Sequence, residues 1–238
     1  MSRPILISLE GNIGAGKSTL LEHLEKHYAG NSDYVFLREP VHLWDYIKDE
    51  NGTTMLSKFY ANPKEYAFPF QIMAYTTRLH ELKRITRENP SCKAIICERS
   101  LEADKHIFAK MLHADGLIDS VMYQIYEKYF AEYDGDFHVD GLVYVRAEPD
   151  TCFDRVSKRS REGENQIQVD YLKKCHMYHE NWLQKTNIDC HTLDVNTNVC
   201  LEKLDEASLM HVWVNEVEKF INRLQKSSSL SQASVVNR

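Results

Sequence analysis

The chain has 238 residues, of which 43% are hydrophobic and 27% are charged, and its formal net charge is -6. This composition is ordinary for one globular domain with a sizeable core, and the length disfavours two independent domains. The negative net charge argues against a general nucleic-acid coat, and no apolar run approaches the roughly 18 residues that a membrane-spanning helix needs.

Short β-branched or aliphatic runs alternate with long helical patterns along the chain. The predicted strands are Pro4–Glu10, Tyr34–Arg38, Ala94–Glu98, Leu142–Arg146 and His191–Val195. The predicted helices are Lys17–Tyr28, Pro63–Arg87, Leu101–His113, Ser120–Tyr133, Asp150–Ser160, Val169–Lys185 and Leu201–Leu224. This alternation predicts an α/β fold with a five-stranded parallel sheet flanked by helices, and ligands then lie beyond the carboxyl ends of the strands. Residues 226–238 are serine-rich without periodicity, so we expect one domain at 1–225 followed by a disordered tail.

A glycine-rich motif follows the first predicted strand. It reads Gly11-Asn12-Ile13-Gly14-Ala15-Gly16-Lys17-Ser18-Thr19. An amphipathic pattern continues from it, so strand, GxxxxGKS and helix occur in the order of a P-loop, in which backbone N–H groups and a helix N-terminus bind phosphates. Lys17 is expected to reach the β- and γ-phosphates of ATP, and Ser18 to hold Mg²⁺. The alternative is a glycine-rich turn that matches the pattern by chance.

Polar residues also stand at the ends of two other strands. Glu39 follows the second predicted strand, and Glu98-Arg99 lies at the end of the third. If these groups converge with the P-loop on one crevice, they supply a base, a metal ligand and a cation for the phosphates. Taken alone, Glu39 also fits a solvated strand-end carboxylate, and Glu98-Arg99 fits a structural ion pair.

A basic cluster lies at the end of the fifth predicted helix, just before Glu164. It consists of Arg155, Lys158, Arg159 and Arg161. One interpretation is a solvated helix face, and the other is a helical lid whose cations close over a triphosphate and exclude water. The P-loop favours the lid.

Other side chains have both a functional and a structural interpretation. Aromatic residues could form a slot for a flat base beside the amide of Gln71, although aromatic residues at helical spacing are more often core; they are Trp44, Tyr60, Phe70 and Phe108. Cys175-His176 and His179 are interpreted as packing residues, because no partner cluster at zinc-site spacing accompanies them. The six cysteines form no Cys-x-x-Cys pair, and the first strand starts close to Met1. We therefore expect reduced thiols, no leader peptide and a cytoplasmic protein.

Five ordered motifs together resemble one enzyme family. They are GNIGAGKST, REPVHLW, FPFQ with Arg78 following, ERSLEAD and KRSREGE. In this order and spacing, from about Ile5 to about Phe220, they resemble the deoxyribonucleoside kinases, in particular the branch of deoxycytidine, deoxyguanosine and deoxyadenosine kinases. The resemblance implies a P-loop kinase with a helical lid that phosphorylates the 5′-hydroxyl of a deoxyribonucleoside with ATP and Mg²⁺ in nucleotide salvage. It also implies a homodimer formed through the helices Pro63–Arg87 and Ser120–Tyr133.

The resemblance further implies a role for each matching residue. Glu39 is similar to the general base that takes the 5′-hydroxyl proton, Arg99 to an arginine between the base region and the 5′ side, and Glu98 to the carboxylate beside Mg²⁺. Gln71 is similar to the amide that reads the base. The other implied contacts are an apolar sandwich of Trp44, Phe70 and Phe108, a 3′-hydroxyl pair of Tyr60 and Glu164, lid arginines Arg159 and Arg161 with Arg155 nearby, and an adenine loop of Asp194-Val195-Asn196-Thr197-Asn198.

Ala74, Arg78 and Asp104 resemble the positions that distinguish the branches of this family. A polar Arg–Asp pair beside the base favours purine deoxynucleosides and deoxycytidine over thymidine, whose methyl group it crowds. One rival is a thymidylate kinase-like nucleoside monophosphate kinase, which needs cations where this chain has Glu39 and Tyr60. The other is a non-catalytic P-loop switch, although the chain has no NKxD guanine signature. We expect neither a nucleic-acid polymer nor a membrane as partner.

Overall fold

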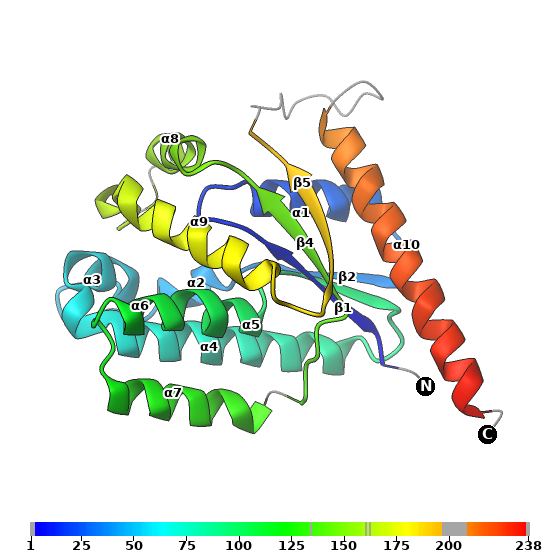
Figure 1. Ribbon diagram of the computed structural model, residues 1–238, viewed down its shortest axis with the longest axis horizontal. Helices are drawn as coiled ribbons and strands as arrows, with labels where there is room; N and C mark the ends of the chain where they lie inside the picture. The colour runs from blue at the N-terminus through cyan, green and yellow to red at the C-terminus, as the bar shows by residue number, and fades with distance from the viewer. Residues whose placement is uncertain (1–2, 134, 160, 162, 197–208, 237–238) are drawn as a thin grey trace.

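The computed structural model describes residues 3–133, 135–159, 161, 163–196 and 209–236 (Figure 1). Its five strands are β1 (Ile5–Glu10), β2 (Tyr34–Leu37), β3 (Ala94–Glu98), β4 (Gly141–Arg146) and β5 (Asp189–Asp194). They form one parallel sheet in the order β2-β3-β1-β4-β5. The predicted five-stranded parallel α/β fold is therefore confirmed, and β1, which leads into the P-loop, occupies the centre of the sheet.

Helices surround this sheet on both faces. They are α1 (Lys17–His27), α2 (Val41–Trp44), α3 (Met55–Ala61), α4 (Pro63–Glu88), α5 (Leu101–Ala103), α6 (Lys110–Ala114), α7 (Ser120–Tyr133), α8 (Pro149–Arg159), α9 (Val169–Leu183) and α10 (Leu209–Val236). A π-helical stretch, η1 (Asp104–Ala109), joins α5 to α6, and a short 3₁₀ turn, η2 (Glu164–Gln166), precedes α9. None of the helices in the described part of the chain combines the length and hydropathy needed to cross a bilayer.

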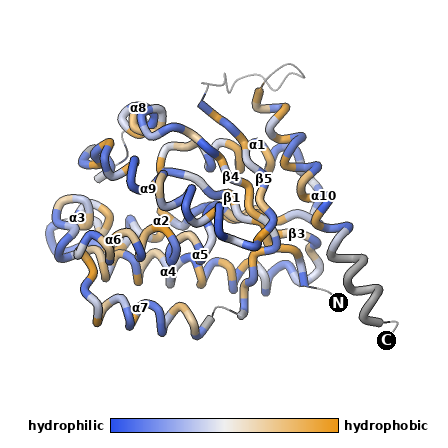
Figure 2. Tube along the Cα trace, in the orientation of Figure 1, coloured by the Kyte–Doolittle hydropathy of each residue, from blue (hydrophilic) through white to orange (hydrophobic). Residues whose placement is uncertain are grey.

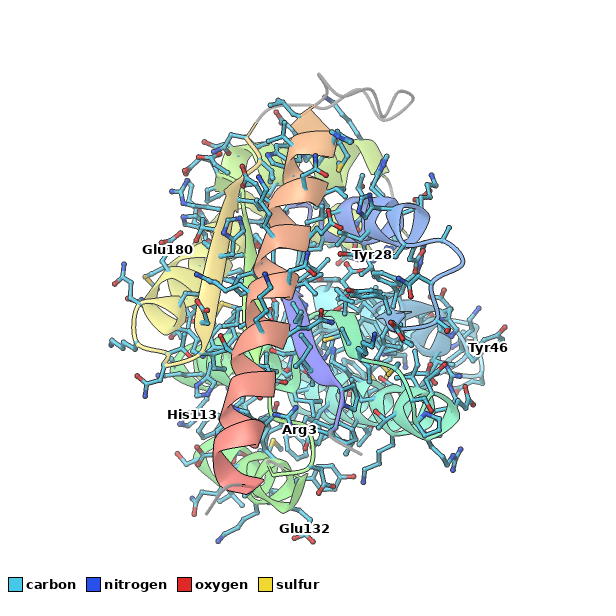
Figure 3. All side chains as sticks on the ribbon, turned by 90° about the vertical axis from the view of Figure 1, so that its right-hand side faces the viewer. Arg3, Tyr28, Tyr46, His113, Glu132 and Glu180 are labelled. Carbon is cyan, nitrogen blue, oxygen red and sulfur yellow. The ribbon has the colours of Figure 1, made fainter. Side chains whose placement is uncertain are left out.

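The side-chain alternation of β1 places apolar residues on both faces of the sheet. Ile7 and Leu9 belong to a core shared with α1 and α10, whereas Leu6 belongs to a second core shared with α4, α7 and α9. Both cores bury apolar surface, which is the main favourable term in folding. Along α4 and α7 hydrophobic and hydrophilic residues alternate, as expected for helices with one buried side (Figure 2). Figure 3 shows the molecule from the side of α10, with Tyr28 labelled. Tyr28, which follows α1, stacks on Tyr34 of β2 with ring centroids 4.1 Å apart.

The P-loop depends on glycine for its close approach to α8. Gly14 has a φ of 80°, and a Cβ atom there would lie 2.6 Å from the carbonyl oxygen of Cys152. Gly16, with a φ of 106°, precedes the first residue of α1 in the same left-handed region. A side chain at Gly14 would both strain the backbone and push the loop away from α8, and a side chain at Gly16 would strain the backbone. The glycines therefore keep the loop in its tight conformation against α8.

Three elements differ from their sequence-based predictions. The predicted helix Leu101–His113 is interrupted by η1, whose wider turn carries Asp104 and Phe108; π-turns of this kind are frequent at functional sites. The short helices α2 and α3 were not predicted because segments this brief carry little periodicity. Helix α10 continues to Val236, where the sequence predicts a disordered tail from 226. Leu209–Val236 contains neither glycine nor proline, so nothing in the backbone ends the helix there. The predicted first turns at 201–208 lie outside the described residues.

Candidate active site

One cavity of about 440 Å³ opens at the carboxyl ends of the central strands, between the P-loop, α4, η1 and the segment after α8. All the residues predicted to contact the nucleoside line it: Glu39, Trp44, Tyr60, Phe70, Gln71, Ala74, Arg78, Arg99, Asp104, Phe108 and Glu164. The P-loop residues Ile13, Gly14, Ala15, Gly16, Lys17, Ser18 and Thr19 and the basic residues Arg155, Arg159 and Arg161 line its other end. The fold thus brings together groups that are more than 140 residues apart in sequence.

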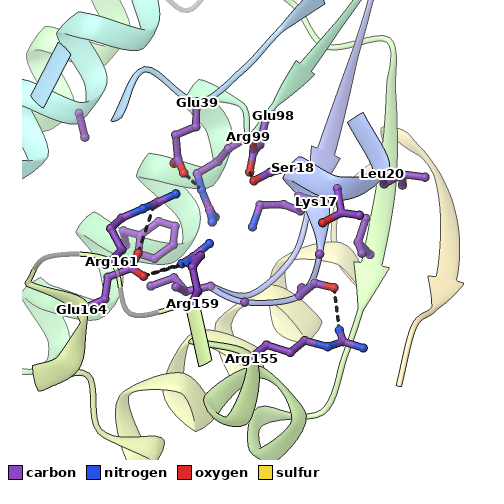
Figure 4. Close-up of a pocket in the computed structure, with 18 of the residues that line it drawn as sticks. Lys17, Ser18, Leu20, Glu39, Glu98, Arg99, Arg155, Arg159, Arg161 and Glu164 are labelled. Carbon is purple, nitrogen blue, oxygen red and sulfur yellow. Dashed lines mark hydrogen bonds and ion pairs between the residues drawn. The ribbon is translucent and has the colours of Figure 1, made fainter. Parts of the chain in front are cut away.

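Lys17 is the buried cation of the phosphate end (Figure 4). Its Nζ donates to the carbonyl oxygens of Gly11 at 3.1 Å and Asn12 at 2.9 Å, so the lysine is held by the start of its own loop. Burial and the nearby Arg99 guanidinium lower the pKa of Lys17 to about 8. An anion next to Lys17 would stabilise its protonated form and so counteract the effects of burial and of Arg99. The site therefore favours a ligand that brings negative charge next to Lys17.

Ser18 of the P-loop and Glu98 at the end of β3 form a pair of oxygen atoms that could bind a metal ion. The Ser18 hydroxyl donates to Glu98 Oε1 at 2.7 Å, and both residues line the cavity. No cluster of three or more His, Cys, Asp or Glu residues suited to a metal exists among the described residues. A hydroxyl and a carboxylate suit Mg²⁺, which binds few protein oxygens and takes its remaining ligands from water and phosphate.

Glu39 is held in its ionised form by two arginines. Its Oε1 accepts hydrogen bonds from Arg78 Nη2 at 2.8 Å and Arg99 Nε at 3.2 Å. Burial alone would raise the pKa of Glu39, but Arg99 and Arg78 outweigh it and lower the pKa to about 2. The carboxylate is therefore a charged hydrogen-bond acceptor that faces the phosphate end of the cavity (Figure 4).

Arg99 has an uncommon backbone conformation. Its φ of 69° makes it the one described non-glycine residue with positive φ. Such a conformation costs about 1–3 kcal/mol and persists only where the surroundings hold it. Its guanidinium lies over the ring of Phe108, 4.6 Å from the centroid, and its Nη2 donates to the Gly11 carbonyl at 3.3 Å. The turn thus directs a cation into the middle of the cavity.

A buried ion pair lines the opposite wall. Arg78, on α4, is 2% exposed and bonds Asp104 of η1 through Nη1 while its Nη2 holds Glu39. Burial raises the pKa of Asp104 to about 6, and the Arg78 charge opposes that rise, so the pair is ionised at neutral pH. The Arg78 guanidinium thereby connects the Glu39 carboxylate with the Asp104 carboxylate.

Aromatic rings and one amide complete this wall. Trp44 and Phe70 meet edge to face at 5.6 Å, and Phe59 stacks on the other side of Phe70 at 4.6 Å. Gln71 is 2% exposed, and its Oε1 has no hydrogen-bond partner among the described residues. A buried amide without a partner is costly, so a flat polar ligand that bonds to Gln71 would be favoured here.

Basic residues of α8 and of the segment after it contact Glu164 and the P-loop. Arg159 Nη2 donates to Glu164 Oε2 at 2.6 Å and Arg161 Nη1 to Oε1 at 3.2 Å (Figure 4). Burial and the Glu164 charge raise the pKa of Tyr60, which keeps its hydroxyl protonated beside that carboxylate. Arg155 instead donates to the carbonyl oxygens of Ala15 at 3.1 Å and Val195 at 2.6 Å. It therefore joins α8 to the P-loop and to the segment after β5.

The chain matches the deoxynucleoside kinase family over residues 7–222, which includes every residue of the cavity. The chain belongs to this family. It is 38% identical to a Fowlpox virus (strain NVSL) protein named "Probable deoxycytidine kinase FPV151", over 76% of this chain and 72% of that protein. It is 32% identical to deoxycytidine kinase 1 of Xenopus laevis, over 92% and 91% of the two chains, and 30% identical to the mitochondrial deoxyguanosine kinase of the same species, over 75% and 73%.

Four predicted site residues of this deoxynucleoside kinase do not line the cavity: Gly11 and Asn12 at the start of the P-loop, and Asp194 and Asn196 after β5. Asn196 Nδ2 donates to Asp194 Oδ1 at 2.6 Å, and Asn196 Oδ1 accepts from the Glu148 N–H at 2.7 Å, so the two side chains bond to each other and to the turn before α8. Among the described residues of that loop, Val195 lines the cavity. Thr197 and Asn198 lie outside the described residues.

The cavity of the kinase also contains residues that the sequence did not mark. Leu56, Tyr171, Met210 and Trp213 line it. Apolar residues at helical spacing predict a buried face, but the pattern does not tell whether that face meets the core or a cavity. Cys175 and His179, interpreted as packing residues, are both fully buried.

Proposed function

We propose that this deoxynucleoside kinase transfers the γ-phosphate of ATP to the 5′-hydroxyl of deoxycytidine or a purine deoxynucleoside, in preference to thymidine, and serves nucleotide salvage. One observation carries the proposal: the ionised Glu39 lies between the buried Arg78–Asp104 pair and the P-loop lysine in a single cavity. The names of the relatives, deoxycytidine and deoxyguanosine kinases, support the same substrate class.

Glu39 would act as the proton acceptor. A 5′-hydroxyl is a poor nucleophile, and a carboxylate within hydrogen-bond reach takes its proton as the oxygen attacks. The new bond joins the 5′ oxygen to the γ-phosphorus, the bond from that phosphorus to the β–γ bridging oxygen breaks, and ADP leaves with its electron pair. Because the pKa of Glu39 is lowered to about 2, the group is a weak base, and positioning rather than proton affinity supplies most of its effect.

The phosphate end would bind ATP with Mg²⁺. Lys17 would contact the β- and γ-phosphates, and Ser18 with Glu98 would hold Mg²⁺, which neutralises phosphate charge when bound. Arg159 and Arg161, which now contact Glu164, would act as lid cations on the triphosphate. Asp194 and Asn196 would lie near the adenine, a role that the resemblance to the family alone supports.

The opposite end would recognise the nucleoside. Gln71 offers an unpartnered amide oxygen to the base, and Trp44, Phe70 and Phe108 supply apolar contacts. Tyr60 and Glu164 would bind the 3′-hydroxyl. Close to the base, the charges of Arg78 and Asp104 with the small Ala74 favour cytosine and purine edges, whereas a thymine methyl would face a charged pair without a hydrogen bond.

A panel of nucleosides tests this proposal against its rivals. With radiolabelled ATP, we expect labelled monophosphates from deoxycytidine, deoxyguanosine or deoxyadenosine, and a smaller yield from thymidine. Labelled diphosphates from the deoxynucleoside monophosphates would show a monophosphate kinase, and ATP binding without transfer to any acceptor would show a nucleotide-binding switch. Either result contradicts the proposal.

We also propose a homodimer and a cytoplasmic location. Exposed apolar residues on α7, a helix that packs against α4, support the dimer: Val121 is 67% exposed and Ile125 is 52% exposed. The five described cysteines are all free, which fits a reducing compartment. Val121→Glu should shift the molecular mass measured by light scattering from dimer to monomer, because it places a charge in the interface. The matched change Val212→Glu, on the exposed side of α10, should not. A dimeric Val121→Glu protein would place the interface elsewhere.

A further inference from the structure

Glu10 is a buried carboxylate for which the proposed reaction has no use so far. It is the last residue of β1, it precedes the first P-loop glycine, and none of its side chain is exposed. Its Oε1 accepts two hydrogen bonds, from the Ser8 hydroxyl at 2.7 Å and from the Ser100 N–H at 2.9 Å. Its Oε2 has no hydrogen-bond partner among the described residues. Burying a carboxylate with one unpaired oxygen costs free energy. Such a group in a folded protein calls for an explanation, and its contacts point to one.

The contact with Ser100 fixes the turn that carries Arg99. The N–H of Arg99 donates to the Leu9 carbonyl at 3.0 Å, and the next N–H, that of Ser100, donates to Glu10. Two consecutive residues of β1 thus bind two consecutive N–H groups of the turn. Arg99 has its positive φ of 69° at this point, a conformation that residues other than glycine rarely adopt.

The direction of Arg99 depends on this turn. Its guanidinium reaches Glu39 through Nε at 3.2 Å and lies over the Phe108 ring, and both contacts begin from a backbone held in the left-handed region. Glu98, which receives the Ser18 hydroxyl, is the residue before it. If the turn relaxed to a negative φ, the side chain of Arg99 would leave its position between Glu39 and Phe108.

We propose that Glu10 is a positioning residue for phosphoryl transfer: its carboxylate holds the Ser100 N–H and thereby keeps the strained Glu98–Arg99–Ser100 turn aimed into the cavity. The proposal rests on the proposed kinase function and deepens it. The requirement is for a hydrogen-bond acceptor at this point, since the geometry concerns a neutral N–H group. A contribution of the Glu10 charge to Lys17 is a different role, and the experiment separates the two.

Three single variants test the acceptor. Glu10→Gln keeps an oxygen that can accept from Ser100, Glu10→Leu keeps the approximate size without an acceptor, and Ser8→Ala removes the other hydrogen bond to the same oxygen. Each variant is assayed at a temperature where circular dichroism shows it folded, with the active fraction measured by ATP binding. We expect Glu10→Leu to lower kcat by about tenfold or more with the KM for ATP nearly unchanged, and Glu10→Gln and Ser8→Ala to stay within about threefold of the wild type.

Each other outcome overturns the proposal. If Glu10→Gln loses as much kcat as Glu10→Leu, the charge matters and the acceptor does not. If folded Glu10→Leu has wild-type kcat, or if Ser8→Ala loses as much, Glu10 does not position the turn. Absence of nucleoside phosphorylation by the wild type would instead refute the proposed function, and the stability measurement below does not depend on that function.

A second measurement uses stability alone. Glycine adopts a φ of 69° without strain, whereas alanine does not, and both Arg99→Gly and Arg99→Ala remove the same side chain. If Glu10 holds the strained turn, Glu10→Leu should lower the Tm less in the Arg99→Ala background, where the freed turn relaxes and releases its strain, than in the Arg99→Gly background, where there is no strain to release, by about 2 °C or more. Equal losses in the two backgrounds would overturn the proposal, and the Arg99→Gly background keeps the test possible if Glu10→Leu alone does not fold.

Discussion

The loop at the phosphate end of the cavity comes from one stretch of chain, residues 11–19, to which α8 and the segment after it add arginines. The nucleoside end instead combines Glu39 after β2, Gln71 and Arg78 from α4, and Asp104 from η1. The first end is shaped by backbone conformation, as the left-handed Gly14 and Gly16 show. The second is shaped by side chains that hold one another: Arg78 bonds both Glu39 and Asp104.

This difference determines how each end responds to mutation. Lys17 is the one cation that residues 11–19 contribute, so its loss has no substitute within the P-loop. At the nucleoside end, removal of one charge leaves its partner buried and unpaired, which confuses loss of recognition with loss of stability. Single substitutions are therefore informative at the first end and paired substitutions at the second.

The largest effect is expected at the phosphate end. Lys17→Ala should lower kcat/KM for ATP by about 10³ or more, because no other cation of the loop reaches the β- and γ-phosphates. Transfer of label from radiolabelled ATP to deoxycytidine measures this. Lys26→Ala removes an exposed lysine of the same helix, one that pairs with Glu22, and should leave transfer unchanged. Turnover by Lys17→Ala near the level of Lys26→Ala would refute the P-loop interpretation.

Glu39→Gln tests the point at which the two ends meet. The amide cannot accept the 5′ proton, so we expect kcat to fall by about 10² or more while ATP binding is retained. Glu25→Gln, which removes a surface carboxylate paired with Arg38, is the matched control. Steady-state kinetics with a separate ATP-binding titration make the comparison. A kcat within about threefold of the wild type would end the assignment of Glu39 as general base.

A paired change tests the nucleoside end. Arg78→Met with Asp104→Ala, with or without Ala74→Val, removes both charges at once and should raise kcat/KM for thymidine relative to deoxycytidine and deoxyguanosine by at least about tenfold, or about 1.4 kcal/mol. Competition between two labelled nucleosides measures the ratio directly. A folded variant with the wild-type ratio, or a wild type that already prefers thymidine, would place base selection elsewhere.

The same contrast explains what could be predicted from the sequence. The P-loop was located from consecutive residues because its backbone conformation needs glycine at fixed positions. The parallel sheet followed from alternating strand and helix patterns. The nucleoside end was assembled from a resemblance to a family, since no periodicity indicates that Arg78 of α4 and Asp104 of η1 meet across 26 residues.

Other features depend on contacts that sequence patterns do not encode. The π-helical turn at Asp104–Ala109 interrupts a segment whose pattern predicts a regular helix. The left-handed backbone conformation at residue 99 belongs to an arginine, so no glycine in the sequence indicates it. Glu10 looked like the end of a strand, and its contact with Ser100 depends on the pairing of β1 with β3. Tertiary contacts decide these positions, whereas local preference decides the P-loop.

The pH dependence gives the smallest expected effect and separates the free enzyme from its complexes. Burial and Arg99 lower the pKa of Lys17 to about 8, and ATP should bind the form with protonated Lys17. We therefore expect kcat/KM for ATP at pH 8 to be about half its value at pH 7 and to fall further above that. Bound phosphates restore the lysine charge, so kcat should stay nearly flat over the same range.

A lowered lysine pKa also affects stability. The unfolded chain binds more protons than the folded protein between pH 8 and the ordinary lysine pKa, so Lys17 destabilises the folded state fully below pH 8 and less as the pH rises. Lys17→Met, which does not titrate, should lose that rise in Tm, and an unchanged rise would show that Lys17 is an ordinary lysine in the free enzyme.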